Sequence, residues 1–171
     1  MKVMKTILLF ATLSLAAFAQ VAPVTTAMPT YVGGYVNYNQ DTVAHHVGMG
    51  ALGAVPVSSQ VGLYSVTCVD MSPAFKTDPG TGKRLLVLNP TVRTGLHKTL
   101  YTGTKFQLLL GGDLGLGASV GGPLMSVTGT VAYQLNSHLA LLMPFRGSYV
   151  QAASAWSVIP EIALVWKPTT K

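Results

Sequence analysis

Apolar and polar residues alternate with a period of two along most of the chain. The clearest run is Lys105–Ser119, KFQLLLGGDLGLGAS. One face of this run carries apolar side chains such as Leu108 and Leu114, and the other carries small or polar ones such as Gly111 and Asp113. Successive side chains of a β-strand point to opposite faces, so the pattern predicts a strand between two different surroundings. A typical strand of a globular protein has only about five or six residues.

Seven further segments read as strands, although the inward face of the third cannot be assigned. They are Tyr31–Asn39, Ala44–Val55, Val61–Asp70, Leu85–His97, Leu124–Leu135, His138–Ser148 and Trp156–Trp166. Eight is the smallest even number of strands that closes a bacterial outer-membrane barrel. We therefore predict an all-β fold, a transmembrane up-and-down antiparallel β-barrel of about eight strands. With both termini in the periplasm, the polar segment Met71–Arg84 becomes a loop outside the cell.

A transmembrane helix is the main alternative. Leu114–Ser137 contains no charged residue and is long enough to cross a bilayer as a helix. Pro123 and several glycines interrupt it, and its apolar residues recur every two positions rather than every three or four. Strands therefore fit this segment better than a helix does.

The first nineteen residues have the features of a secretory signal peptide. Lys2 and Lys5 precede an apolar stretch, and Ala17-Phe18-Ala19 forms a small-x-small cleavage site before Gln20. We expect a signal peptide over residues 1–19, a short lead over 20–29, a β-barrel domain over 30–167 and a C-terminal tail over 168–171.

The composition is unusual for a soluble exported domain. Charged residues make up only 9% of the chain, and the mean hydropathy is +0.44. Too few charges are present to cover an ordinary water-facing surface. The formal net charge of +6 includes the two lysines of the predicted signal peptide. Without a basic cluster between aromatic residues, this excess does not favour nucleic-acid binding.

The pattern over residues 30–166 resembles the small eight-stranded outer-membrane barrels of the OmpA and OmpX type. The most specific element is the last strand, in which Ile162, Leu164 and Trp166 alternate and end in an aromatic residue. It resembles the C-terminal signal by which such barrels are recognised for assembly, although the tail to Lys171 extends beyond it. The resemblance implies location in the cell outer membrane, contact with outer-membrane lipids and lipopolysaccharide, and the barrel-assembly machinery as a partner.

Four charged residues fall on the faces that we assign to the lumen, the interior of the barrel: Arg93, Asp113, Arg146 and Glu161. Eight strands leave an interior just wide enough to be filled by side chains, here expected to be polar and small. An unpaired charge in it would be costly. We expect a salt-bridged plug, with Asp113 opposite Arg146; a polar constriction or proton path is the alternative. The first-strand tyrosines Tyr31, Tyr35 and Tyr38 fit either a membrane interface or ordinary strand packing.

The sequence gives little support for a metal site, a catalytic serine or a phosphate-binding loop. Adjacent His45 and His46 would point to opposite faces of a strand and could not readily hold one metal ion. His97 and His138 fall at predicted turns and are expected to be solvated. The sequence contains no Gly-x-Ser-x-Gly elbow for a serine nucleophile, and the glycine spacing before Lys83 does not match a phosphate-binding loop.

We therefore predict a monomeric outer-membrane barrel with a structural or surface-interaction role, without catalytic residues, metal or cofactor. A narrow passive pore for small solutes and a membrane-embedded lipid-modifying enzyme are the alternatives. No nucleic-acid partner is expected.

Overall fold

The computed structural model describes residues 28–40, 45–117, 122–150 and 155–168, and its regular elements are all strands. The strands are β1 Tyr31–Gln40, β2 His45–Ser58, β3 Leu63–Thr77, β4 Arg84–Thr102, β5 Phe106–Gly117, β6 Gly122–Gln134, β7 Leu139–Val150 and β8 Ala155–Trp166. The eight predicted strands are confirmed, including β5 and β6 in the segment for which a helix was the alternative. Within the described residues, no helix is long and apolar enough to span a membrane.

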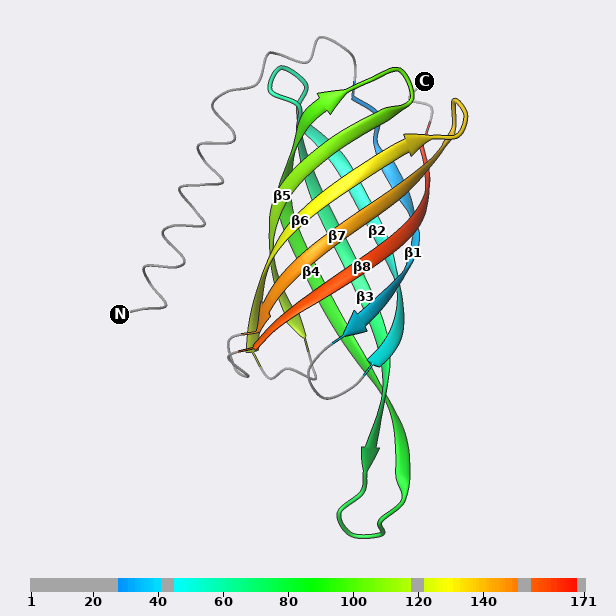
Figure 1. Cartoon of the computed structure of the whole chain (residues 1–171), viewed down its shortest axis with the longest axis vertical. Coiled ribbons are helices and arrows are strands. Elements are labelled where there is room, and N and C mark those ends of the chain that lie inside the picture. Colours follow the sequence, from blue (N-terminus) through cyan, green and yellow to red (C-terminus); the bar gives the residue numbers. More distant parts are fainter. Residues whose placement is uncertain (1–27, 41–44, 118–121, 151–154, 169–171) are drawn as a thin grey trace, which may run out of the picture.

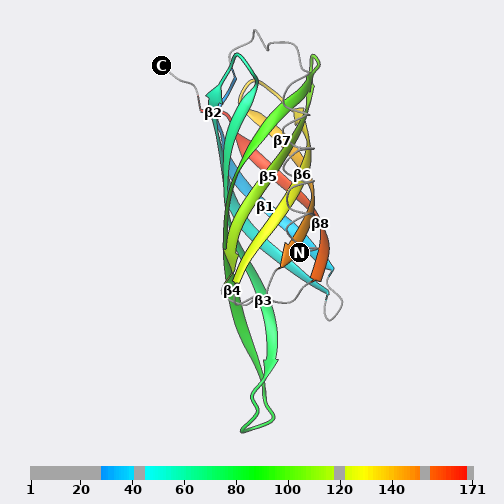
Figure 2. The ribbon, with the colours of Figure 1, turned by 90° about the vertical axis from the view of Figure 1, so that its left-hand side faces the viewer.

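Every strand pairs antiparallel with the next one in the chain, and β1 pairs with β8 to close the barrel (Figures 1 and 2). This is the predicted up-and-down topology. Because β1 begins where β8 ends, with Val32 opposite Trp166, we call this end of the barrel the terminal end. The opposite end is the hairpin end.

The hairpin of β3 and β4 projects well beyond the rest of the barrel (Figure 1). Its pairing continues from Ser72 opposite Asn89 to Thr77 opposite Arg84, past the last pairs with β2 and β5. The prediction of a loop over Met71–Arg84 is therefore wrong for most of that segment. Polar residues ended the alternation there, but a strand outside a membrane meets water and does not need an apolar face.

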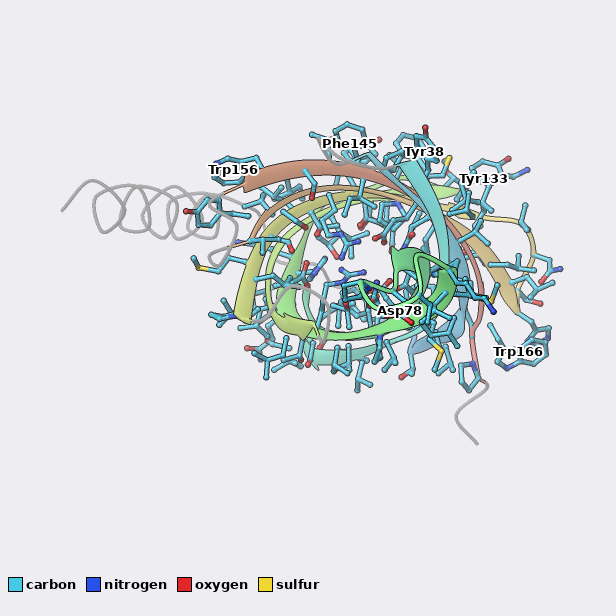
Figure 3. All side chains as sticks on the ribbon, turned by 90° about the horizontal axis from the view of Figure 1, so that it is seen from below. Tyr38, Asp78, Tyr133, Phe145, Trp156 and Trp166 are labelled. Carbon is cyan, nitrogen blue, oxygen red and sulfur yellow. The ribbon has the colours of Figure 1, made fainter. Side chains whose placement is uncertain are left out.

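The outer surface of the barrel is apolar. Exposed side chains include Val47, Met49, Leu114, Leu116 and Phe145, each at least 60% exposed. Exposed aromatic side chains lie near the strand ends at both rims: Tyr101, Phe106, Tyr133 and Trp166 at the terminal end, and Tyr38 and Trp156 at the hairpin end. Figure 3 shows Tyr38, Tyr133, Trp156 and Trp166 pointing away from the barrel. An apolar band between two aromatic girdles is the outer surface of a transmembrane barrel.

The lumen is filled in two layers. The layer nearer the terminal end is apolar and contains Tyr31, Leu52, Tyr64, Leu142 and Val165, all 7% exposed or less. The next layer holds buried charged and hydroxyl side chains. The expectation that polar and small side chains fill the lumen is thus wrong for the terminal half, because β3, whose inward face could not be assigned, contributes Tyr64, and β1 turns Tyr31 inward.

Candidate functional site

Arg93 is the centre of the charged layer. Its side chain is 2% exposed, and its Nε donates to Asp70 Oδ2 at 3.0 Å. One terminal nitrogen donates to Glu161 Oε1 at 3.2 Å and to the Tyr35 hydroxyl at 3.2 Å. The other lies 3.9 Å from Asp113 Oδ2. One guanidinium on β4 therefore contacts carboxylates from β3, β5 and β8, and so crosses the lumen.

Arg146 supplies the second cation from β7. Its Nη2 lies 2.7 Å from Glu161 Oε1, and its Nη1 lies 4.0 Å from Asp70 Oδ2. The predicted pairing of Asp113 with Arg146 is wrong. Strands run obliquely around a barrel, so positions counted along two strands do not measure height, and the neighbouring strand β8 brings Glu161 to Arg146 instead.

Asp113 has its own set of partners. His97 Nε2 lies 2.8 Å from one carboxylate oxygen, and the Thr128 hydroxyl donates to the other at 2.8 Å. The sequence placed His97 at a solvated turn, but β4 continues five residues further to Thr102, so this imidazole is 4% exposed inside the barrel. That expectation is also wrong.

The glycines of the opening run make room for this layer. Gly115 pairs with Arg93 and Gly111 with His97 across β4 and β5. A Cβ atom on Gly115 would lie 2.9 Å from Arg93 Cγ, and one on Gly111 would collide with the His97 ring. Large side chains of β4 thus lie over bare backbone of β5, which explains why small residues recur on the inward face of that strand.

Asp70 is the member that sequence reasoning missed. It is 4% exposed and accepts hydrogen bonds from Arg93, from the Tyr35 hydroxyl and from Asn37 Nδ2, the last at 3.1 Å. It was assigned to the edge of a polar loop. The signal in the sequence was that Asp70 lies two residues after Cys68 on the same strand and so faces the same side as this cysteine, which is buried.

We call Asp70, Arg93, His97, Asp113, Arg146 and Glu161 the lumen network. Its two guanidinium groups face three carboxylates. Every member is at most 5% exposed. The space between the network and the apolar layer is only about 40 Å³, room for about one water molecule. The two layers together fill the described part of the lumen with side chains.

The tip of the β3–β4 hairpin is the second ordered polar feature. The Asp78 carboxylate accepts from the Gly80 amide at 2.9 Å and from the Thr81 hydroxyl at 2.6 Å. The Thr81 hydroxyl and the Gly80 amide lower the pKa of Asp78. Gly82 adopts a positive φ of 67°, which glycine accommodates without strain. The only acid of the tip is therefore used within the turn, while Lys83 is exposed beside it.

The remaining predicted positions lie outside the lumen. Ala19 and Gln20, the predicted cleavage site, lie outside the described residues. Ile162, Leu164 and Trp166 all point outward and are 50% exposed or more. His138 is exposed, as expected, and its ring stacks on Trp166 with centroids 5.4 Å apart.

Among the described residues, no group of three or more histidine, cysteine, aspartate or glutamate side chains is placed to hold a metal ion. The side chains of His45 and His46 are not among those described.

Comparisons with known proteins identify solved structures with a similar fold. No protein-family model matches the sequence, and no curated protein matches it. Neisserial surface protein A is similar in structure with a TM-score of 0.61, at 11% identity over 81% of this chain and 96% of that one. A designed transmembrane β-barrel gives 0.60 at 11% identity, over 84% and 98%.

Ail, the attachment invasion locus protein of Yersinia pestis, gives a TM-score of 0.52 at 6% identity over 82% and 97%. Ail has also been solved in complex with the heparin analogue sucrose octasulfate. Identities this low bear on the fold alone. By its closed eight-stranded sheet and its apolar outer band, this chain has the fold of the small transmembrane β-barrels.

Proposed function

We propose that the protein is a non-conducting barrel of the cell outer membrane that holds the β3–β4 hairpin at the cell surface for interaction with an anionic partner. The observation that carries this proposal is the closed lumen. Arg93 bridges carboxylates of three other strands, and the apolar layer lies beneath it. A barrel with a filled interior offers no path for solutes, so its function lies on the surfaces that it presents.

The extension of the β3–β4 hairpin supports the orientation. At the terminal end, short turns join β4 to β5 and β6 to β7, as in the periplasmic turns of such barrels. The extended hairpin lies at the other end and would face outward. Fold similarity to Neisserial surface protein A and to Ail supports the outer membrane as the location, and the predicted signal peptide would direct export.

The charge of the hairpin supports an anionic partner. Around its tip the sequence places Lys76, Lys83 and Arg84 against the single acid Asp78, whose carboxylate is held within the turn. The complex of Ail with a heparin analogue gives a suitable probe chemistry. Leu85, Leu86 and Leu88 are at least 50% exposed beside the tip, so a partner would also cover apolar surface.

Conductance in planar lipid bilayers tests closure. We expect the purified barrel to give no single-channel steps, because two side-chain layers fill its lumen. A variant in which Arg93 is replaced by alanine serves as the comparison, since it removes the side chain that crosses the lumen. Regular ohmic steps from the wild-type protein would instead support the passive pore.

Heparin binding tests the surface role separately. Lys83→Glu should weaken binding of the detergent-solubilised barrel to heparin, whereas the same change at Lys171 should not. Equal effects of the two changes would show that binding follows net charge and not the hairpin.

A further inference from the structure

The lumen opens at the terminal end into a cavity of about 340 Å³. We call this cavity the vestibule. Its volume lies in the range of about 300–1,000 Å³ that small-molecule sites occupy. The apolar layer closes it toward the interior, because Tyr31 and Ala132 line both the vestibule and the small space above the lumen network. A molecule that enters from this end is therefore retained and not passed through the barrel.

A buried ammonium group that has no carboxylate partner among the described residues lines the vestibule. Lys167 follows β8 and is only 9% exposed, and its Nζ lies 5.5 Å from the centroid of the Tyr31 ring. Neither an aspartate nor a glutamate is among the described residues that line the cavity. Desolvation lowers the pKa of Lys167, as expected for a cation that lacks a carboxylate partner. Lys105 adds a second positive charge at the mouth.

Neutral hydrogen-bonding groups accompany this cation. The Gln107 carbonyl oxygen accepts from the Tyr31 hydroxyl at 3.3 Å, which leaves its amide nitrogen without a partner among the described residues and free to donate. Thr99 and Thr102 also line the cavity. Met28, Pro29 and Ala140 supply an apolar wall. The vestibule thus combines a positive centre and polar side chains with an apolar surface.

We propose that the vestibule binds a small organic oxyanion, a carboxylate or a phosphate ester with a short apolar body, and that Lys167 is its charged anchor. Charge-assisted hydrogen bonds from an ammonium to an oxyanion are among the stronger ones, and the anion would supply the partner that Lys167 lacks. The site lies at the opposite end from the hairpin and does not depend on the surface role proposed above.

Titration of the ¹⁵N-labelled full barrel in a non-ionic detergent tests the proposal, with phenyl phosphate, benzoate and the cation benzylamine as probes. We expect the two anions to shift the backbone amide signals of Gln107 and Thr102, and benzylamine to leave them unchanged. Comparing phenyl phosphate with benzoate identifies the preferred head group, and inorganic phosphate alone measures the contribution of the apolar body.

Lys167→Met should weaken binding of the preferred anion by about tenfold or more, equivalent to about 1.4 kcal/mol. Lys83→Met is the matched control, because it removes the same charge at the hairpin tip and should leave the affinity unchanged. If unheated Lys167→Met migrates on a denaturing gel like unheated wild type, the barrel still folds in the variant. Equal affinities of wild type and Lys167→Met, equal losses in both variants, or an absence of anion-induced shifts at millimolar concentration would each overturn the proposal.

Discussion

Replacement of Arg93 by methionine tests whether the lumen network holds the barrel together. Methionine keeps most of the apolar stem but removes the guanidinium that contacts Asp70, Asp113 and Glu161. In the variant, Asp70 and Glu161 would share the single remaining guanidinium of Arg146, while Asp113 would keep only His97 and Thr128 as partners. The adjoining cavity measures only about 40 Å³, so little space lies on that side for water to solvate the carboxylates.

Loss of one partner from a buried ion pair costs about 3–5 kcal/mol, because the other charge remains buried and unpaired. Guanidinium unfolding of small domains has a slope of about 2–6 kcal/mol per molar. We therefore expect the unfolding midpoint of Arg93→Met to fall by about 1 M. The exposed control Lys83→Met loses the same charge and should stay within about 0.5 kcal/mol of wild type.

The measurement is tryptophan fluorescence of the barrel in lipid vesicles, followed to equilibrium in guanidinium chloride. A second variant separates the charge effect from loss of packing. If unpaired carboxylates cause the destabilisation, then adding Asp70→Asn to Arg93→Met should cost less than the sum of the two single changes, by about 1–3 kcal/mol. A midpoint of Arg93→Met equal to that of Lys83→Met, or strictly additive effects, would refute the reasoning.

Three further predictions concern backbone packing and the hairpin. Gly33→Ala should destabilise the barrel by about 1–3 kcal/mol, because the added Cβ would collide with the Leu164 backbone. Gly147→Ala should not destabilise it, because the added Cβ meets open space. Unfolding in guanidinium chloride compares the two variants. Asp78→Ala should speed tryptic cleavage of the hairpin tip without lowering the stability of the barrel. The pKa of Asp78 is lowered, so the hydrogen bonds that its carboxylate accepts in the turn are complete above the ordinary pKa of about 3.9. They are lost only as the pH falls through the lowered pKa. The Gly80 amide resonance should therefore stay unchanged from pH 7 to 5.

The positions of the strands could be predicted because alternation is a local property. A membrane barrel wall has lipid on one side and a packed lumen on the other, so each strand records both surroundings in its own residues. The inward positions of Arg93, Asp113, Arg146 and Glu161 follow from parity alone. Where alternation stops, as beyond Met71, the sequence marks the edge of the membrane and not the end of the strand, and the hairpin was missed for that reason.

The pairing within the lumen could not be predicted. Which carboxylate meets which guanidinium depends on the stagger between strands and on their tilt, which are properties of the closed sheet. Arg146 therefore meets Glu161 on the adjacent strand, and Asp113 meets His97. The inward position of Asp70 could not be assigned from the sequence. It follows only from the register of β3 with β4, which decides which residues of β3 face the lumen.

The sequence by itself determined an all-β chain with eight membrane-crossing strands, an apolar outer band and charges turned inward, because each of these follows from period-two alternation. Only the tertiary structure decided that two layers of side chains fill the lumen, that the β3–β4 hairpin continues beyond the barrel, and that Lys167 lies in a cavity beside Tyr31. Those features join residues far apart in the chain, and closure of the sheet is what brings them together.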